Sequence, residues 1–440
     1  MVELVVGEAA HGGWCVAREP DGRVVFVRHA LPGERVRARL TEATTRFARA
    51  DAVEILDASP DRVQPPCPHA RPGGCGGCDW QHASLTAQRT IKAAVVSQQL
   101  RRIAGLERDV VVEPLAGDDQ GLGWRTRVRF AVGEDGTAGL RKHRSHEVIA
   151  VGDCPIAHPE IQHAGITHQP WPGASSVEAV AGSGPAGGPG ELAIVVAPGR
   201  SHRGAAGAPG RVGREERDAW KTAVEADSVL VARGGGLSAL RGQGFVREAV
   251  AGRVWRVGAG VFWQVHPGAA QTLAGAVLEA LSPEPGQMAL DLYCGAGLFA
   301  GVLADAVGPD GTVIGVESDA AAVRDARHNL RHTPWARVHR GDVAEVLGRV
   351  GAADADIAVL DPPRAGVARP VLDLLLGPGR AGSQAAGGLR RVAYVSCDPA
   401  TLARDIAVFM AAGWTLGPVR AFDAFPMTHH VECVATLTRE

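Results

Sequence analysis

The chain has 440 residues, with 46 Lys and Arg against 48 Asp and Glu, so its formal charge is −2. This near balance excludes a globally basic nucleic-acid binder, and any basic surface has to be local. With 45% hydrophobic and 21% charged residues, the composition is that of a folded protein and excludes global disorder. The length predicts roughly two to four domains.

The N-terminus and the cysteine content bear on the compartment. The chain start lacks a basic region followed by a long apolar core, and no run of about 18 apolar residues occurs in the sequence. Eight cysteines are too few for a disulfide scaffold in a chain of this length. We therefore expect a cytoplasmic protein with no membrane partner, in which clustered cysteines are metal ligands or nucleophiles.

The first 60 residues carry short β-rich runs and predict a small β-barrel. The alternation in residues 35–40 places Arg35, Arg37 and Arg39 on one face of a strand. Such a face suits RNA phosphates and equally suits a solvated strand, and the pattern alone favours the solvated strand.

A helix and a β-rich region follow the barrel. Ser84 is a suitable N-cap for a helix that ends at Ala104. Residues 124–132 and 147–151 have the texture of strands. Residues 163–213 are rich in Ala, Gly, Pro and His, and parts of this stretch are predicted to be loops within a β domain.

From Gly268 onward, strands and helices alternate, which is typical of a doubly wound α/β domain. The strands end in polar motifs, as expected where an open sheet binds its ligands. The predicted strands are 287–292, 312–316, 356–360, 391–395 and 431–438, and the predicted helices include 269–281, 320–332 and 401–412.

A glycine-rich turn, Asp291-Leu-Tyr-Cys-Gly295-Ala-Gly297, follows the first of these strands. The glycines let a ligand approach the N-terminus of the next helix, and Glu317 is placed to accept hydrogen bonds from ribose hydroxyls. The pattern also matches a dinucleotide fingerprint or a turn that binds nothing. Asp291, whose carboxylate can meet a methionine ammonium, favours S-adenosylmethionine.

Two further strand ends carry reactive groups. Asp361-Pro-Pro-Arg364 is related to a motif of amine methyltransferases, but Arg364 replaces their aromatic residue, which argues against amine methylation. Ser396-Cys397-Asp-Pro places a cysteine before a helix, and we expect the helix N-terminus and a nearby Arg to lower the thiol pKa. The alternative is a buried cysteine that only packs.

A cysteine and a second base suit methylation of pyrimidine carbon 5. That carbon attacks a methyl sulfonium only after a thiolate has added to carbon 6, and a base then removes the carbon 5 proton. Glu432 is the candidate base, with His429 and His430 as rivals. Cys433 points to the opposite face of its strand and is predicted to pack.

Four other cysteines have the spacing of metal ligands. Cys67, Cys75 and Cys78 lie in one glycine-rich loop, and Cys154 lies further along in Gly-Asp-Cys-Pro. The spacing suits an iron–sulfur cluster or tetrahedral zinc without choosing between them, and free thiols are the alternative.

A basic strand lies between the last two of these cysteines. Alternation places Arg125, Arg127 and Arg129 on one face, which forms a local basic patch. RNA phosphate is a plausible partner for the patch, and the nearby Trp80 and Trp124 are candidates for stacking on bases.

Taken in order, these motifs resemble the bacterial RNA uridine-5-methyltransferases, which include 23S rRNA and tRNA enzymes. The resemblance spans nearly the whole chain. It implies an α/β protein with a C-terminal Rossmann-like class I methyltransferase domain, an N-terminal OB-like TRAM barrel that binds RNA, and a central β-rich iron–sulfur domain. The expected boundaries are 1–60, 61–255 and 256–440.

The resemblance also assigns roles to residues by their positions in the motifs. It implies that Cys397 is the nucleophile, that Glu432 is the base, and that the four spaced cysteines hold a [4Fe-4S] cluster. The Cys67–Cys75 spacing is longer than is usual in the family, and Leu298 replaces a residue that is often polar. The residues implied to contact S-adenosylmethionine are Gln264, Tyr293, Glu317, Asp342 and Asp361.

The leading hypothesis is therefore methylation of a uridine in structured RNA, most of all 23S rRNA, with no obligate protein partner. A tRNA substrate is the nearest alternative. A nucleotide-dependent oxidoreductase would leave Cys397 and Glu432 unexplained, and an inactive RNA-binding relative would have no need to keep them.

Overall fold

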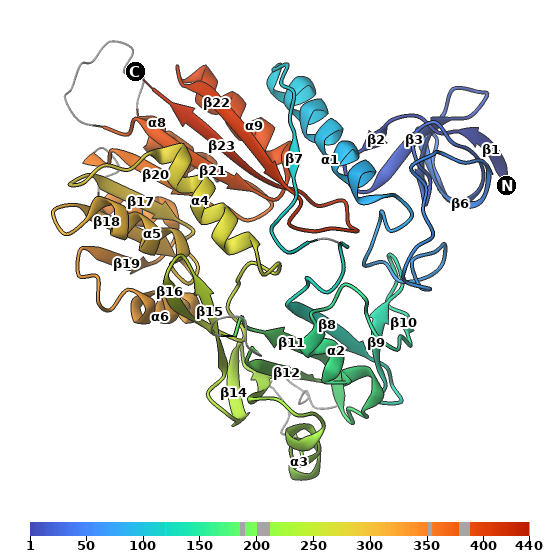
Figure 1. The fold of residues 1–440 in the computed structure, drawn as a ribbon, viewed down its shortest axis with the longest axis horizontal. Coiled ribbons are helices and arrows are strands. Elements are labelled where there is room, and N and C mark those ends of the chain that lie inside the picture. Colours follow the sequence, from blue (N-terminus) through green and yellow to red (C-terminus); the bar gives the residue numbers. More distant parts are fainter. Residues whose placement is uncertain (119, 185–189, 200–211, 351–353, 378–387, 440) are drawn as a thin grey trace.

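The protein is described by a computed structural model covering residues 1–118, 120–184, 190–199, 212–350, 354–377 and 388–439. It has an N-terminal barrel, a central β sheet and a large C-terminal α/β sheet (Figure 1). Within these ranges no helix is both long and apolar enough to cross a membrane.

The barrel is a six-stranded sheet in the order β1-β5-β6-β4-β3-β2. Alternation along β5 buries Val36 and Ala38 and leaves Arg35 and Arg37 on the outer face, where Asp57, Glu54 and Glu3 pair with them. The predicted alternation is confirmed, and the acidic partners favour a solvated face. The strands are Val2–Val5, Ala9–Ala10, Trp14–Arg18, Val24–Arg28, Arg35–Ala43 and Phe47–Asp57.

The central sheet has seven strands in the order β10-β9-β8-β11-β12-β13-β14. Residues 163–213 contain loops within a β domain, as predicted, but they also contain β11 and β12, which form the middle of the sheet. Residues 185–189 and 200–211 lie outside the described part of the chain. The elements are β8 (Arg127–Val132), β9 (Ala138–Arg141), β10 (Val148–Ile149), α2 (Pro159–His163), η2 (Ile166–His168), β11 (Ala174–Ala181), β12 (Leu192–Pro198), α3 (Arg214–Thr222), β13 (Ser228–Arg233) and β14 (Gly236–Arg241).

Helix α1 (Leu85–Gln99) lies between the barrel and the C-terminal sheet (Figure 1). Ser84 caps it as predicted, by accepting a hydrogen bond from the Ala87 amide, and the helix continues as one π-helical turn, η1 (Leu100–Ala104). One part of α1 packs into the barrel core and its C-terminal part packs on the C-terminal sheet. The helix therefore joins the two bodies.

The C-terminal sheet has the order β19-β18-β17-β20-β21-β23-β22-β7. Strands β17 to β21 are parallel and β23 is antiparallel to both of its neighbours, so the predicted doubly wound α/β domain is confirmed. The strands are β7 (Val112–Glu113), β17 (Met288–Leu292), β18 (Thr312–Glu317), β19 (Ala336–Arg340), β20 (Ile357–Leu360), β21 (Arg391–Ser396), β22 (Thr415–Phe422) and β23 (Glu432–Thr438). The helices are α4 (Ala269–Leu281), α5 (Leu298–Val307), α6 (Ala320–Asn329), α7 (Val343–Val350), α8 (Arg369–Leu376) and α9 (Pro399–Ala411).

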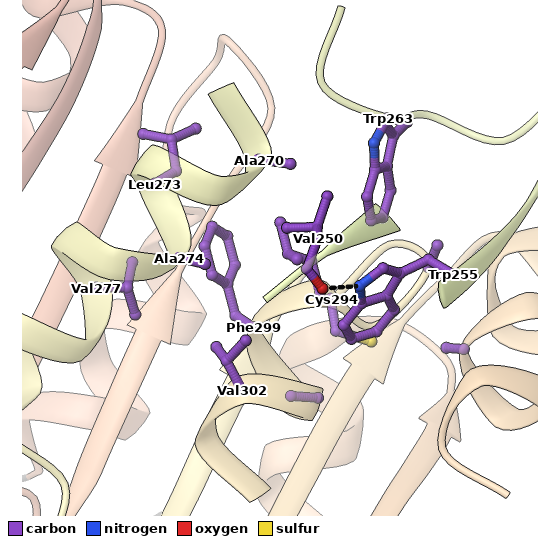
Figure 2. Packing of buried hydrophobic residues seen from close by; sticks show 14 of the residues in the cluster. Val250, Trp255, Trp263, Ala270, Leu273, Ala274, Val277, Cys294, Phe299 and Val302 are labelled. Atoms are coloured by element: carbon purple, nitrogen blue, oxygen red, sulfur yellow. Dashed lines mark hydrogen bonds between the residues drawn. The ribbon is translucent and has the colours of Figure 1, made fainter. Parts of the chain in front are cut away.

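A hairpin of β15 (Phe245–Val250) and β16 (Arg253–Gly258) packs against the helices beside the glycine-rich turn. Trp255 is buried there with Phe299, and its indole N–H donates to the Val250 carbonyl over 3.0 Å (Figure 2). A Cβ at Gly301 would lie 2.3 Å from the Trp255 ring, so only glycine fits under it. This packing fixes α5, which begins at the glycine-rich turn.

Candidate active site

The sheet has a topological switch point at β17, which pairs with β18 on one side and β20 on the other. Open α/β sheets bind ligands in the crevice at the carboxyl ends of such strands. The glycine-rich turn lies there, with positive φ at Tyr293 (67°) and Gly297 (92°). A Cβ at Gly297 would lie 3.3 Å from Ala326 in α6, so glycine lets the turn approach that helix.

Two acidic side chains line this turn. The Glu317 carboxylate accepts hydrogen bonds from the Gly295 amide (3.0 Å) and the Asp319 amide (2.7 Å). Asp291 is fully buried, and its Oδ2 accepts from the Ala300 amide at 2.6 Å. Its Oδ1 is buried without a hydrogen-bond partner among the described residues. Burial, with smaller contributions from the charges of Asp361 and Glu317, raises the pKa of Asp291 to about 8.

The other residues predicted to contact a cofactor are not all at the same place. Asp361 follows β20, and burial raises its pKa to about 7. Tyr293 lies within electrostatic reach of Asp342, an exposed carboxylate that accepts from the Ala344 amide at the start of α7. Gln264 is buried between β16 and α4, and no hydrogen bond within the described ranges joins it to the others.

Cys397 and Glu432 face each other at the ends of two paired strands. Strand β21 ends at Ser396, which pairs with Cys433 in antiparallel β23, so the next positions outward are Cys397 and Glu432. Cys433 is fully buried in the core, as predicted. Asp398 caps α9 through hydrogen bonds to the Ala400 and Thr401 amides of 3.0 and 2.9 Å, which fixes the backbone directly after Cys397.

The expectation of a lowered thiol pKa is wrong. Burial and, to a smaller extent, the charge of Glu432 raise the pKa of Cys397 to about 11. A hydrogen bond and the positive charge from Arg364 lower it, but by less. Sequence reasoning weighed the helix N-terminus and a nearby Arg, and it did not account for the burial of the thiol or for the effect of the Glu432 charge on it.

Glu432 is the buried acidic residue whose charge has the largest effect on the pKa of the Cys397 thiol. Burial raises its pKa well above its usual range, the Asp361 charge adds to this, and Arg364 opposes it. His430 is a poorer base, because burial lowers its pKa to about 3, and its Nε2 lies 3.2 Å from the Arg364 guanidinium. His429 is engaged by Asp79, with 2.6 Å between Nδ1 and Oδ2.

The barrel reaches this site directly. His11, in the turn between β2 and β3, lies 3.2 Å from the Asp398 carboxylate that caps α9. The His11 and His429 rings meet edge to face with centroids 6.4 Å apart. The barrel is therefore in contact with the loops that carry both candidate catalytic residues.

The four spaced cysteines line one cavity of about 860 Å³ beside the barrel and the central sheet. Burial raises the pKa of the Cys78 thiol, and the charges of Cys154 and Cys75 raise it further, so these thiols are close together. In the described part of the chain, no group of three or more His, Cys, Asp and Glu side chains is arranged to hold a metal ion. The metal centre stays a prediction.

The expected aromatic platform for RNA bases is wrong in its residues, because Trp80 and Trp124 are 2% and 3% exposed. Strand β8 begins at Arg127, and Glu178 pairs with both Arg127 and Arg129, which partly neutralises the predicted basic patch. A different surface was missed. The guanidinium groups of Arg28, Arg49 and Arg144 lie 5.6–5.9 Å from the centre of the half-buried Trp14 ring.

Comparison with known proteins identifies the family. Residues 2–53 match the TRAM domain, residues 351–440 match tRNA (Uracil-5-)-methyltransferase, and residues 245–355 match Protein-L-isoaspartate(D-aspartate) O-methyltransferase. The 23S rRNA (uracil(1939)-C(5))-methyltransferase RlmD of Halomonas elongata is 33% identical over 460 residues, which cover 99% of this chain and 89% of that protein. The chain belongs to the RNA (uracil-5-)-methyltransferase family. The expected resemblance is thereby confirmed.

Other relatives agree with this assignment. An RNA methyltransferase of Streptomyces avermitilis without an assigned substrate is 48% identical over 447 residues, covering 99% of this chain and 97% of that protein. The structure of Pyrococcus abyssi tRNA (uracil-54, C5)-methyltransferase in complex with S-adenosyl-L-homocysteine superposes with a TM-score of 0.70 at 22% identity, covering 99% and 100% of the two chains. The α/β methyltransferase fold with an N-terminal TRAM domain is therefore confirmed.

Proposed function

We propose that this protein transfers a methyl group from S-adenosylmethionine to carbon 5 of a specific uridine in 23S rRNA, through a covalent adduct on Cys397. The observation that carries the proposal is the pair of facing strand ends that bring Cys397 and Glu432 together beside Arg364. Membership of the RNA (uracil-5-)-methyltransferase family supports the choice of target atom.

The two residues divide the reaction between them. The Cys397 thiolate adds to carbon 6 of the uracil, and the electron pair displaced to carbon 5 forms the bond to the methyl group. The bond between that methyl group and the sulfonium sulfur breaks, and its electron pair stays on sulfur, which leaves as S-adenosylhomocysteine. Glu432 then removes the carbon 5 proton, the electron pair of that C–H bond restores the double bond, and the thiolate leaves. Arg364 assists by favouring the thiolate. The target base has to leave its stack to reach Cys397.

The crevice at the glycine-rich turn fits the cofactor that supplies the methyl group. The unpartnered Oδ1 of buried Asp291 suits an ammonium group, and an unpaired buried carboxyl is costly without one. The carboxylates near the turn suit the hydroxyl groups of the polar remainder of the molecule. The residues proposed to contact S-adenosylmethionine remain Gln264, Tyr293, Glu317, Asp342 and Asp361.

We propose further that Cys67, Cys75, Cys78 and Cys154 hold a [4Fe-4S] cluster. They share one cavity, and the Gly77 amide donates to the Cys75 sulfur over 3.4 Å, a contact that stabilises cluster thiolates. A Cβ at Gly74 would lie 2.2 Å from the His69 carbonyl oxygen, so the loop requires glycine. Iron and sulfide in equal amounts after anaerobic purification support the cluster, and stoichiometric zinc contradicts it.

We propose that the RNA partner binds to the barrel and to the residues around it. The TRAM match and the guanidinium groups of Arg49 and Arg144 beside Trp14 support contact with phosphates and unstacked bases. The 33% identity to RlmD supports 23S rRNA, and tRNA is the second candidate because of the tRNA (Uracil-5-)-methyltransferase match. We place the protein in the cytoplasm, where both RNAs occur in bacteria.

The test is release of tritium from transcripts labelled at uridine carbon 5, in the presence of S-adenosylmethionine. Unmodified transcripts of 23S rRNA and of tRNA are compared. We expect release from the 23S rRNA transcript by the wild-type protein and none by Cys397→Ala, because the proton leaves only from an adduct.

The control is Cys15→Ala, which removes a buried thiol in the barrel and should leave release unchanged. Release from tRNA alone would move the substrate assignment to tRNA. Release by Cys397→Ala at the wild-type rate would overturn the covalent mechanism.

A further inference from the structure

The loop that carries the candidate base is fixed from outside its own domain. This base loop, residues 423–431, connects β22 to β23 and contains His429 and His430 just before Glu432. Its backbone includes Met427 at a φ of 67°, a conformation that side chains other than glycine rarely adopt. Such a loop keeps its shape only where its neighbours hold it.

Helix α1 supplies one set of contacts. Lys92 and Asp423 form an ion pair of 2.5 Å in which both side chains are buried, and the Lys92 ammonium also donates to the Phe425 carbonyl over 2.9 Å. The Gln88 side chain accepts from the Met427 amide over 2.8 Å. These contacts fix the first half of the base loop.

Asp79 supplies the contacts to the second half. It directly follows Cys78, and its amide and that of Trp80 both donate to the Met427 carbonyl, over 2.9 and 3.0 Å. Its Oδ2 lies 2.6 Å from His429 Nδ1 and 3.1 Å from the His429 amide. No other carboxylate within the described ranges has a hydrogen bond or ion pair with His429.

The barrel closes over the other side of Asp79. Its Oδ1 lies 3.4 Å from the buried Arg28 guanidinium, and a Cβ at Gly13 would lie 2.7 Å from the Asp79 carboxyl carbon. The carboxylate is thus enclosed by the barrel, the cysteine loop and the base loop. One side chain fixes all three relative to each other.

We propose that Asp79 is a positioning residue for the base: its hydrogen bonds to His429 hold the base loop so that Glu432 reaches the carbon 5 proton of the methylated adduct. The proposal rests on the proposed function. Asp79 lies outside the facing strand ends, so its loss should affect proton removal and spare thiolate addition and methyl transfer. Because Asp79 directly follows Cys78, it also links the loop that lines the cysteine cavity to the base loop.

The experiment follows two labels in one turnover. Wild type and Asp79→Asn, matched for iron and sulfide content, react with RNA carrying tritium at uridine carbon 5 and with S-adenosylmethionine carrying ¹⁴C in the methyl group. In wild type the two rates should coincide. In Asp79→Asn we expect ¹⁴C incorporation at the wild-type rate and tritium release slower by about ten- to a hundredfold, the scale expected for a misplaced group. A denaturation-resistant protein–RNA adduct should accumulate.

Three further variants make the result specific. His429→Ala removes the partner of Asp79 and should give the same separation of the two rates. The double variant Asp79→Asn/His429→Ala should release tritium no more slowly than either single variant. Glu432→Gln is the reference for full retention of tritium. Asp153→Asn changes a carboxylate that directly precedes Cys154 and lies outside the base loop, so both rates should match wild type.

The outcomes distinguish failure of the positioning role from failure of the proposed function. Equal loss of both labels in Asp79→Asn, or wild-type rates for both, overturns the positioning role while leaving the reaction in place. Absence of both labels from wild-type reactions overturns the proposed function itself. The positioning role is also overturned if Glu432→Gln retains tritium while His429→Ala releases it at the wild-type rate.

Discussion

Two carboxyl groups at the cofactor crevice retain protons near neutral pH. Burial raises the pKa of Asp291 to about 8 and that of Asp361 to about 7. Between their ordinary values near 4 and these raised values, the folded protein binds more protons than the unfolded chain, so these groups make it less stable as the pH rises. A cation bound beside Asp291 reverses this effect by favouring the ionised form.

Binding of S-adenosylmethionine should therefore tighten with pH. Between pH 6 and pH 7.5 the ligand ammonium stays largely protonated while Asp291 has to release its proton on binding, so we expect the affinity to rise by about tenfold per pH unit. Calorimetry in two buffers of different ionisation enthalpy measures both affinity and proton release. Asp291→Asn should bind more weakly and with a flat pH profile, and an unchanged slope in that variant would contradict the assignment.

Arg364 should control the reactivity of Cys397. Its hydrogen bond and charge lower a thiol pKa that burial and Glu432 hold at about 11, so Arg364→Met should raise that pKa further. We expect slower alkylation of Cys397 by iodoacetamide at pH 8 to 9, followed by peptide mass spectrometry. Arg369→Met, which removes an exposed pair with Asp373, is the matched control. Equal rates in both variants would remove Arg364 from this role.

At the scale of elements, the sequence predicted the C-terminal strands well because buried parallel strands are continuous apolar runs, as in β20 and β21. It missed β11, which consists mostly of small residues, and β12, whose apolar run lies inside a stretch rich in Ala, Gly and Pro. It also missed β7, whose two residues carry no period. The facing of Cys397 and Glu432 depends on the β21–β23 register, which no local pattern encodes. For the same reason the raised thiol pKa and the role of Asp79 were out of reach.

Removing one partner of the buried ion pair between α1 and the base loop should be strongly destabilising. Lys92→Met leaves Asp423 buried without its cation, and Asp423 Oδ2 already lacks a partner among the described residues. We expect the free energy of unfolding to fall by about 3–5 kcal/mol. The double variant Lys92→Met/Asp423→Leu should recover much of that loss in denaturant titrations. A double variant as unstable as the single one would show that packing, not charge, sets the cost.

At the scale of the whole molecule, near-neutral net charge coexists with a local concentration of guanidinium groups around Trp14. On the outer face of β5, Arg35 and Arg37 each have a carboxylate partner of their own, Asp57 and Glu54 respectively. By contrast, Arg49 and Arg144 share the single carboxylate of Glu42. We therefore expect RNA to contact the surface where the barrel meets the hairpin of β9 and β10, rather than the outer face of β5.

Arg144→Ala should weaken RNA binding and reduce the slope of log affinity against log salt by about one, as expected for a lost phosphate contact. Fluorescence anisotropy with a 23S rRNA fragment at several salt concentrations measures both quantities. Arg37→Ala, which removes a guanidinium already paired with Glu54 and Glu3, is the control and should leave the slope unchanged. Identical slopes for wild type and Arg144→Ala would exclude this surface.

The two-residue strand β7 has a consequence for synthesis. It pairs in parallel with β22, joining Val112 to Ala421 across about three hundred residues (Figure 1). At ribosomal rates of about 5–20 residues per second, the N-terminal portion waits about 15–60 s for that partner. Meanwhile the apolar side chains of Val96 and Leu100, which the C-terminal sheet later covers, have no native cover. The nascent chain should therefore depend on chaperones until translation is almost complete.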